Sequence, residues 1–244
     1  MSEARSWSGA DYDRLSTPME AMGREVLERL PLTGGETVID AGCGSGRVTE
    51  ALLARLPSGR VIGVDQSASM IDAARERLGD RAELHVADLA TFDLGLQADA
   101  LLSTATFHWI ADHDALFARL HAHLHPGALL VAQCGGQGNI ARVHAAAREV
   151  MAIEPYAPSF EGWRGPWNFA APEETEERLR AAGFQEARAW LQERPVTQQR
   201  LDEVVVRVND ADVHFAVVWF ASDRVPKNRD ALRTFGQITR AQRG

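Results

Sequence analysis

The stretch Val38-Ile39-Asp40-Ala41-Gly42-Cys43-Gly44-Ser45-Gly46 decides the fold. In it, a short apolar run ends in an aspartate and passes directly into three glycines at alternate positions. Glycines at the turn from a strand into a helix allow a sharp backbone reversal and let a ligand approach the main chain closely. The helix that follows offers free N–H groups in its first turn. The stretch therefore predicts a ligand-binding turn between a buried strand and a helix.

The spacing of these glycines separates two classes of ligand. Dinucleotide sites favour G-x-G-x-x-G, with the pyrophosphate at the helix N-terminus. Here the third glycine, Gly46, comes one position earlier, and Asp40 precedes the loop. A carboxylate at a strand end suits a cationic or amine-bearing ligand better than a pyrophosphate, and S-adenosylmethionine carries both a sulfonium and an ammonium. A glycine turn that binds nothing is the alternative that the motif alone leaves open.

Short apolar runs alternate with segments of helical periodicity through the first part of the chain. We expect strands at residues 37–41, 61–64, 83–87, 98–103 and 129–134, and helices at 11–30, 46–56, 67–78 and 112–124. This β-α-β-α order predicts a parallel sheet with helices on both faces.

Two further aspartates follow expected strands. Asp65 ends the second strand, where a carboxylate can accept hydrogen bonds from both ribose hydroxyls of a nucleoside. Asp88 follows the third strand, where it could accept from an adenine amino group. Either residue could instead cap a helix or lie in a solvated turn. Because ligands of open parallel sheets bind at the carboxyl ends of the strands, Asp40, Asp65 and Asp88 together favour a nucleoside site.

The pattern changes after residue 139. We expect a helix over residues 140–151, an aromatic, proline-rich loop over 154–172 that acts as a lid or binding wall, a helix over 173–182, and strands over 184–191 and 213–221. The predicted organisation is an N-terminal helical segment (1–35), a cofactor-binding core (36–138), a lid or substrate region (139–172), the end of the sheet (173–224) and a tail (225–244).

Composition narrows the class of protein. The chain has 244 residues and a formal net charge of −8, which disfavours nucleic acid and anionic membranes as partners. No apolar run is long enough to span a bilayer, and no secretory signal is recognisable. Two cysteines cannot build a disulfide framework. We therefore expect a cytoplasmic protein, monomeric or homodimeric, that acts on a small molecule.

Several stretches stand where a cofactor-binding sheet would need them. They are Asp40–Gly46, Val64-Asp65-Gln66-Ser67, Ala87-Asp88-Leu89 and His125-Pro126-Gly127. Together they resemble the class I S-adenosylmethionine-dependent methyltransferases. More narrowly, Ser103-Thr104-Ala105-Thr106-Phe107-His108-Trp109-Ile110, Asp112-His113 and Val131-Ala132-Gln133-Cys134-Gly135-Gly136 are similar to the trans-aconitate methyltransferase-like group. The resemblance covers roughly residues 7–196.

The resemblance implies a fold and a set of contacts. The fold would be a Rossmann-like α/β sheet of seven strands, parallel except for an antiparallel last strand that residues 213–221 could supply. The cofactor would be S-adenosyl-L-methionine. Its methionine part would be held by Asp40, Gly42, Gly44 and Gly46, its adenosine by Asp65, Gln66, Met70, Asp88 and Leu89, and Thr104 would line it after the fourth strand.

His108 is the candidate catalytic residue. It follows the fourth strand, near the expected position of the methyl group, and an unperturbed histidine titrates close to neutral pH. A carboxylate acceptor would already be ionised and would need no base, whereas a hydroxyl or carbon acceptor usually would. A packing or hydrogen-bonding histidine is the alternative interpretation of His108.

Candidate substrate contacts come from three parts of the chain. They are Tyr12 in the first helix, Trp109 after the fourth strand, and Arg142, Trp163 and Trp167 in the lid region. Each tryptophan could instead fill the core, and Arg142, like Arg164, could be a surface residue. No metal site is expected, because on a helix His121 and His125 share a face from which His123 points away, and a third ligand is missing.

The predicted function is methyl transfer from S-adenosylmethionine to a small-molecule acceptor, with carboxylate O-methylation favoured. Methylation of a natural-product hydroxyl or carbon, a non-catalytic cofactor-binding protein and a nicotinamide dehydrogenase are the alternatives. The chain departs from the family pattern after Val196, where Leu201-Asp202-Glu203-Val204-Val205-Val206 replaces the expected helix and leucine-rich segment. Substrate contacts from that part are therefore not predicted.

Overall fold

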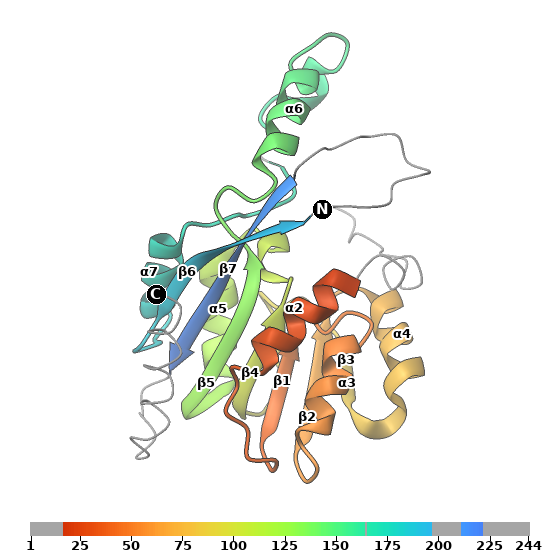
Figure 1. Ribbon diagram of the computed structural model, residues 1–244. Helices are drawn as coiled ribbons and strands as arrows, with labels where there is room; N and C mark the ends of the chain where they lie inside the picture. The colour runs from red at the N-terminus through yellow and green to blue at the C-terminus, as the bar shows by residue number, and fades with distance from the viewer. Residues whose placement is uncertain (1–16, 164, 197–210, 222–244) are drawn as a thin grey trace.

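The computed structural model describes residues 17–163, 165–196 and 211–221 (Figure 1). Within them a seven-stranded sheet has the order β3-β2-β1-β4-β5-β7-β6. The strands are β1 (Thr37–Ala41), β2 (Arg60–Asp65), β3 (Glu83–Val86), β4 (Ala98–Thr104), β5 (Leu124–Gly135), β6 (Arg188–Val196) and β7 (Ala211–Ala221). Strands β1 to β5 pair in parallel. Strand β7, which contains residues 213–221, runs antiparallel to both β5 and β6.

The helices include three that connect parallel strands, β1 to β2, β2 to β3 and β4 to β5, as the alternating pattern predicts. In the described part of the chain the helices are α2 (Thr17–Leu27), α3 (Arg47–Ala54), α4 (Ala68–Leu78), α5 (His113–Ala122), α6 (Ala141–Met151) and α7 (Pro172–Ala181), with short 3-10 turns η1 (Gly79–Arg81), η2 (Phe107–Trp109) and η3 (Ala157–Phe160). The helix expected over residues 112–124 ends at Ala122, and residue 125 already lies in β5. The residue before Pro126 is biased toward extended backbone, which explains the early strand.

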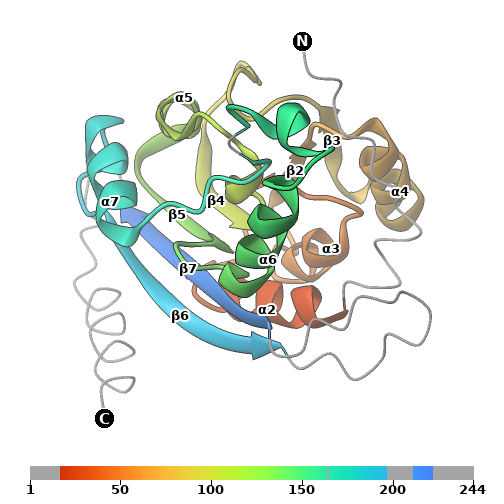
Figure 2. The same cartoon turned by 90° about the horizontal axis from the view of Figure 1, so that it is seen from above.

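Two hydrophobic clusters cover the two faces of the sheet. Successive side chains of a strand point to opposite faces, so Val38 and Ile39 of β1 belong to different clusters. Val38 packs with residues of α2 and α3, and Ile39 packs with residues of α5 and α7. Figure 2 shows the helices on either side of the sheet. The predicted α/β class with helices on both faces is confirmed.

The carboxyl ends of β1, β2 and β4 meet at one edge of the sheet, as the parallel register requires. Helix α6 follows β5 and stands above this edge (Figure 1). The proline-rich segment after α6 leads through η3 to α7 on the opposite side of the sheet from α2. No helix in the described ranges is long and apolar enough to cross a membrane.

Candidate cofactor and acceptor site

The glycine loop turns through left-handed backbone at all three of its glycines. Gly42, Gly44 and Gly46 have φ angles of 81°, 54° and 82°. A Cβ on Gly42 would overlap the side chain of Thr106, and one on Gly46 would meet Leu78, but one on Gly44 would meet nothing within 4 Å. Two of the glycines therefore allow close packing within the protein. Gly44 instead presents bare backbone to open space, which is the arrangement that a ligand contacting the main chain needs.

Asp40 is a buried carboxylate beside this loop. It is 1% exposed, and its Oδ2 accepts a hydrogen bond from the Thr49 hydroxyl at 2.7 Å. Its Oδ1 is buried without a hydrogen-bond partner among the described residues. Burial, opposed by the Thr49 bond and reinforced by the charge of Asp65, raises the pKa of Asp40 to about 6. Near neutral pH the site thus holds a largely ionised group that a cation would stabilise.

Asp65 closes the other side of the loop. Its Oδ2 accepts from the Gly44 amide at 3.0 Å and its Oδ1 accepts from the Ser67 amide at 2.9 Å. Burial raises its pKa, and the two backbone hydrogen bonds oppose that effect. Because each carboxylate oxygen can accept more than one hydrogen bond, Asp65 retains capacity for hydroxyl donors.

The remaining predicted cofactor residues differ in their surroundings. Met70 and Leu89 are buried, Thr104 is half-buried at the end of β4, and Gln66 is exposed. The carboxylate of Asp88 is exposed, and its Oδ1 accepts from the Ala90 amide at 2.8 Å. Asp88 therefore caps a turn here, the alternative left open by the sequence, and its contact with adenine stays a prediction.

Two hydroxyl side chains of the β4 region hold the glycine loop in place. Ser103 donates to the carbonyl of Ala41 at 2.6 Å. Thr106 donates to the carbonyl of Gly42 at 3.3 Å and to that of Thr104 at 2.9 Å. Sequence reasoning did not assign either side chain, because the contact with the loop spans more than sixty residues.

His108 lies in η2 with a fixed tautomer. Its Nδ1 accepts a hydrogen bond from the Gly135 amide at 3.1 Å, and the ring is 9% exposed. A neutral imidazole has one acceptor nitrogen, so the proton is on Nε2. Burial, and secondarily the charge of His113, lowers the pKa of His108 to about 4. His108 is therefore a neutral Nε2–H donor near pH 7, and its Nδ1 lone pair is already engaged.

Rings from the end of β4 and from the lid region meet in an aromatic cluster. It consists of His108, Trp109, His144, Trp167 and Phe169. Trp167 and Phe169 stack at an interplanar angle of 11° and a centroid distance of 5.8 Å. Trp109 lies 5.6 Å from Trp167, and His108 lies 5.7 Å from Phe169. The cluster brings the predicted residues His108, Trp109 and Trp167 together.

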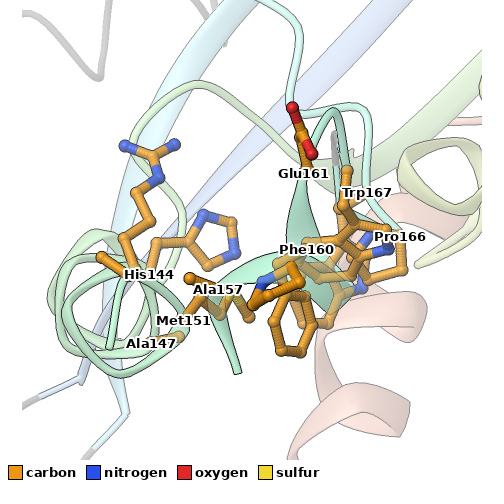
Figure 3. A pocket seen from close by; sticks show the side chains of 13 residues that line it. His144, Ala147, Met151, Ala157, Phe160, Glu161, Pro166 and Trp167 are labelled. Atoms are coloured by element: carbon orange, nitrogen blue, oxygen red, sulfur yellow. The ribbon is translucent and has the colours of Figure 1, made fainter. Parts of the chain in front are cut away.

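A pocket of about 800 Å³ adjoins the cluster, between α6 and the segment that follows it. Figure 3 shows Ala147 and Met151 of α6 on one side and Phe160 and Trp167 on the other. Trp163, predicted to be a substrate contact, lines the pocket and is 49% exposed.

Two predicted substrate contacts cannot be placed at this pocket. Tyr12 lies outside the described residues, as does Arg164. Arg142 lies in the first turn of α6, but its side chain is outside the described part of the chain. Arg148, one turn beyond His144 on α6, is the arginine that lines the pocket among the described residues.

Two polar residues near the cluster were not singled out by the sequence. Asn139 is 8% exposed, and its Oδ1 has no hydrogen-bond partner among the described residues. The Nε2 of His144 is likewise buried without a partner in that part of the chain. The only local signal for His144 was its place on a helix that follows the last parallel strand.

Two of the three histidines at positions 121, 123 and 125 pack against aromatic rings. His123 stacks on Phe92 with ring centroids 4.2 Å apart and accepts from the Leu94 amide through Nε2 at 3.1 Å. His121 packs edge-on against Phe184. No group of three or more histidine, cysteine, aspartate or glutamate side chains in the described ranges is arranged to hold a metal ion.

Comparison with known proteins agrees with this geometry. Residues 38–127 match the family model described as a methyltransferase domain. A trans-aconitate 2-methyltransferase of Paracidovorax citrulli is 38% identical over 152 residues, which are 62% of this chain and 58% of that protein. One of Methylobacterium nodulans is 32% identical over 186 residues, which are 76% of this chain and 67% of that protein. The chain thus spans less than two thirds of the first relative.

The fold is also found among solved structures. Phosphoethanolamine N-methyltransferase 2 of Haemonchus contortus, in complex with S-adenosyl-L-methionine, superposes with a TM-score of 0.60 over 84% of this chain and 53% of that chain. At 18% sequence identity this likeness shows the fold alone. The Methylobacterium nodulans relative, of which the chain covers 67%, establishes that the chain belongs to the class I methyltransferase family, with which the fold agrees, and that it is similar within the family to the trans-aconitate 2-methyltransferases.

Proposed function

We propose that this protein transfers a methyl group from S-adenosyl-L-methionine to a carboxylate of a small molecule. The observation that carries the proposal is the backbone of Gly44, which faces open space while Gly42 and Gly46 are packed against protein. It lies beside two carboxylates, one of which, Asp40, has an unpartnered buried oxygen. A ligand that combines a cation with hydroxyl donors fits these features, and a pyrophosphate does not.

The residues present suit this cofactor, which when bound supplies an electrophilic methyl group. Asp40 would attract its positive charge, the backbone at Gly44 would lie against its amino-acid part, and Asp65 would accept from the ribose hydroxyls. We propose the same cofactor-binding set as the sequence predicted: Asp40, Gly42, Gly44, Gly46, Asp65, Gln66, Met70, Asp88, Leu89 and Thr104.

The state of His108 favours a carboxylate acceptor. A general base needs a free lone pair, but the Nδ1 of His108 accepts from Gly135 and Nε2 carries the proton. We therefore propose that His108 donates a hydrogen bond from Nε2 and orients an acceptor that is already ionised. Trp109, Trp163 and Trp167 would form walls of the acceptor site, with roles for Tyr12 and Arg142 remaining predictions.

The predicted organisation into a core over 36–138 and a lid over 139–172 is part of the same proposal, since pocket-lining residues 144–167 belong to the lid. A small molecule is the proposed partner. A monomeric or homodimeric state and a cytoplasmic location also remain predictions, the latter supported by the two cysteines, which are both free.

The first experiment is calorimetric titration of the full chain with S-adenosylmethionine and S-adenosylhomocysteine, with NADH as the control. Binding of both sulfur ligands and not of NADH is expected. Incubation with labelled cofactor and small carboxylic acids should then give base-labile methyl esters, detected by mass spectrometry. Cofactor binding without turnover on carboxylic, phenolic or other acceptors would favour the non-catalytic alternative. A folded protein that binds neither sulfur ligand would refute the proposal.

A further inference from the structure

The pocket between α6 and the following segment shares a wall with the proposed acceptor site. His144 and Trp167 line the pocket and also belong to the aromatic cluster, where their rings stack at 5.2 Å. The same Trp167 lies 5.6 Å from Trp109, which directly follows His108 in η2. A molecule in the pocket would therefore contact the rings that connect it to the end of β4.

The described lining of this pocket is mainly apolar. Three aromatic side chains, Phe160, Trp163 and Trp167, are joined there by Met151 and by proline and alanine residues. Among the described lining residues the charged groups are one arginine and one glutamate, Arg148 and Glu161, so their charges cancel. The pocket has the size and composition of a small-molecule site that buries an apolar body.

The wall shared by the pocket and the aromatic cluster contains a polar atom without a partner among the described residues. The Nε2 of His144 is buried without a hydrogen-bond partner among the described residues. Burial, and secondarily the charge of Arg148, lowers the pKa of His144. Polar groups buried away from water are normally paired. This nitrogen is closed to solvent in the described structure, so a molecule in the pocket would bond to it only after a turn of the His144 ring.

We infer that the methyl acceptor is a carboxylic acid with a bulky apolar or aromatic body, which this pocket holds, and not a tricarboxylate. The inference rests on the proposed function and names its substrate class. A tricarboxylate would place two further ionised groups against aromatic faces, where Arg148 is the one cation of the described lining and Glu161 offsets its charge. A monocarboxylic acid would instead bury its body between Met151 and Phe160 and extend its one charged group past Trp167 toward the end of β4.

The test compares three acids on the full chain: cinnamic acid, decanoic acid and trans-aconitic acid. With labelled cofactor, at least one of the first two should be methylated with a kcat/KM at least about tenfold above that of trans-aconitic acid. A preference for trans-aconitic acid would overturn the inference and leave the proposed methyl transfer standing. Failure of S-adenosylmethionine to bind would instead count against the proposed function.

Variants of α6 test whether the acid binds in this pocket. Ala147 lines the pocket, so Ala147→Trp should fill it and raise the KM for the preferred acid about tenfold, with cofactor affinity unchanged. Val150 lies on the same helix, is 54% exposed and is not part of the lining, so Val150→Trp should change the KM less than twofold. Equal effects of the two variants would place the acid elsewhere.

A binding measurement tests the same inference without requiring turnover. Cinnamic acid should quench the tryptophan fluorescence of the wild type in the presence of S-adenosylhomocysteine, with a weaker affinity in Ala147→Trp and an unchanged one in Val150→Trp. Unchanged fluorescence at millimolar cinnamic and decanoic acid would overturn the inference even if the enzyme proves inactive. Far-ultraviolet circular dichroism and cofactor titration of each variant separate loss of the pocket from loss of the fold.

Discussion

The amide of Gly135, at the end of β5, donates to Nδ1 of His108, in the turn after β4, over 3.1 Å. Neighbouring strand ends thus determine which ring nitrogen carries the proton. Substitution by asparagine or glutamine can distinguish the roles of the two ring nitrogens. The side-chain oxygen of asparagine can occupy the Nδ1 position, and the side-chain nitrogen of glutamine can occupy the Nε2 position. His108→Gln should keep a donor toward the acceptor, whereas His108→Asn should keep only the bond from Gly135.

We therefore expect His108→Gln to reduce kcat/KM about tenfold and His108→Asn to reduce it about a hundredfold, as loss of a hydrogen bond to a charged group does. Initial rates with the preferred acid, at saturating cofactor, measure the difference. A general base would behave otherwise: both variants would fall by the same large factor, and raising the pH would partly rescue them.

The pH profile gives an independent check on His108. Its pKa of about 4 in the folded protein lies below the ordinary value of 6.5, so the ring stays neutral in the folded state while the unfolded chain binds a proton. The free energy of unfolding should therefore fall as the pH falls from about 6.5 to about 4. The stabilising contribution of the neutral His108 ring is fully present above pH 6.5. The kcat should be flat between pH 6 and 8. NMR titration of the ring should show no midpoint in that range.

Asp40 should destabilise the cofactor-free protein. Its pKa of about 6 lies above the ordinary 3.8, so the folded state holds the proton more tightly than the unfolded chain does. The free energy of unfolding then falls as the pH rises from about 4 to about 6, by up to about 3 kcal/mol, and stays reduced at higher pH. Asp40→Asn should raise stability by about 1–2 kcal/mol at pH 7.5, less at pH 5, and weaken cofactor binding.

Urea denaturation at the two pH values measures the stability change, and calorimetry measures the affinity. Asp72→Asn is a suitable control, because Asp72 is exposed on α4 and pairs with the exposed Arg75. It should change stability by less than about 0.5 kcal/mol. If Asp40→Asn instead made the protein less stable than the wild type by the same amount at both pH values, the buried charge of Asp40 would be compensated within the protein.

Gly44 and Gly95 form a matched pair. Both have left-handed backbone, with φ of 54° and 63°, and a Cβ on either would meet nothing within 4 Å. The amide of each also donates to an aspartate carboxylate. Either change to alanine should therefore cost about 1 kcal/mol of stability from the left-handed backbone. Only Gly44→Ala should weaken S-adenosylmethionine binding, by about tenfold or more; equal affinities would move the ligand away from this loop.

Asp65→Ala removes the acceptor proposed for the ribose. Cofactor affinity should fall by about 1–3 kcal/mol, as loss of a hydrogen bond to a charged group does. The binding of adenosine, which lacks the amino-acid part, should weaken by a similar amount, whereas the binding of free methionine should be unaffected. Comparing these fragments by competition distinguishes a lost ribose contact from general damage to the loop that Asp65 also holds at Gly44.

The sequence could predict the sheet edge because its signals are local. The glycines, Asp40 and Asp65 lie at strand ends that hydrophobic runs define, and the structure brings them together. The contact between Thr106 and Gly42 was not predictable from one sequence, since nothing near either residue specifies the other. His144 and Arg148 were likewise missed, because helical periodicity marks a face of α6 without saying which segment returns to cover it.

The fit of Thr106 against Gly42 has a consequence for how this chain can vary. The threonine side chain occupies the volume that any Cβ at position 42 would need. A larger residue at 42, already strained by the left-handed backbone there, would also need a glycine at 106, and that glycine would loosen the turn leading to His108. Changes at the two positions are therefore epistatic: the loop proposed to hold the methyl donor and the turn that carries His108 constrain each other's substitutions.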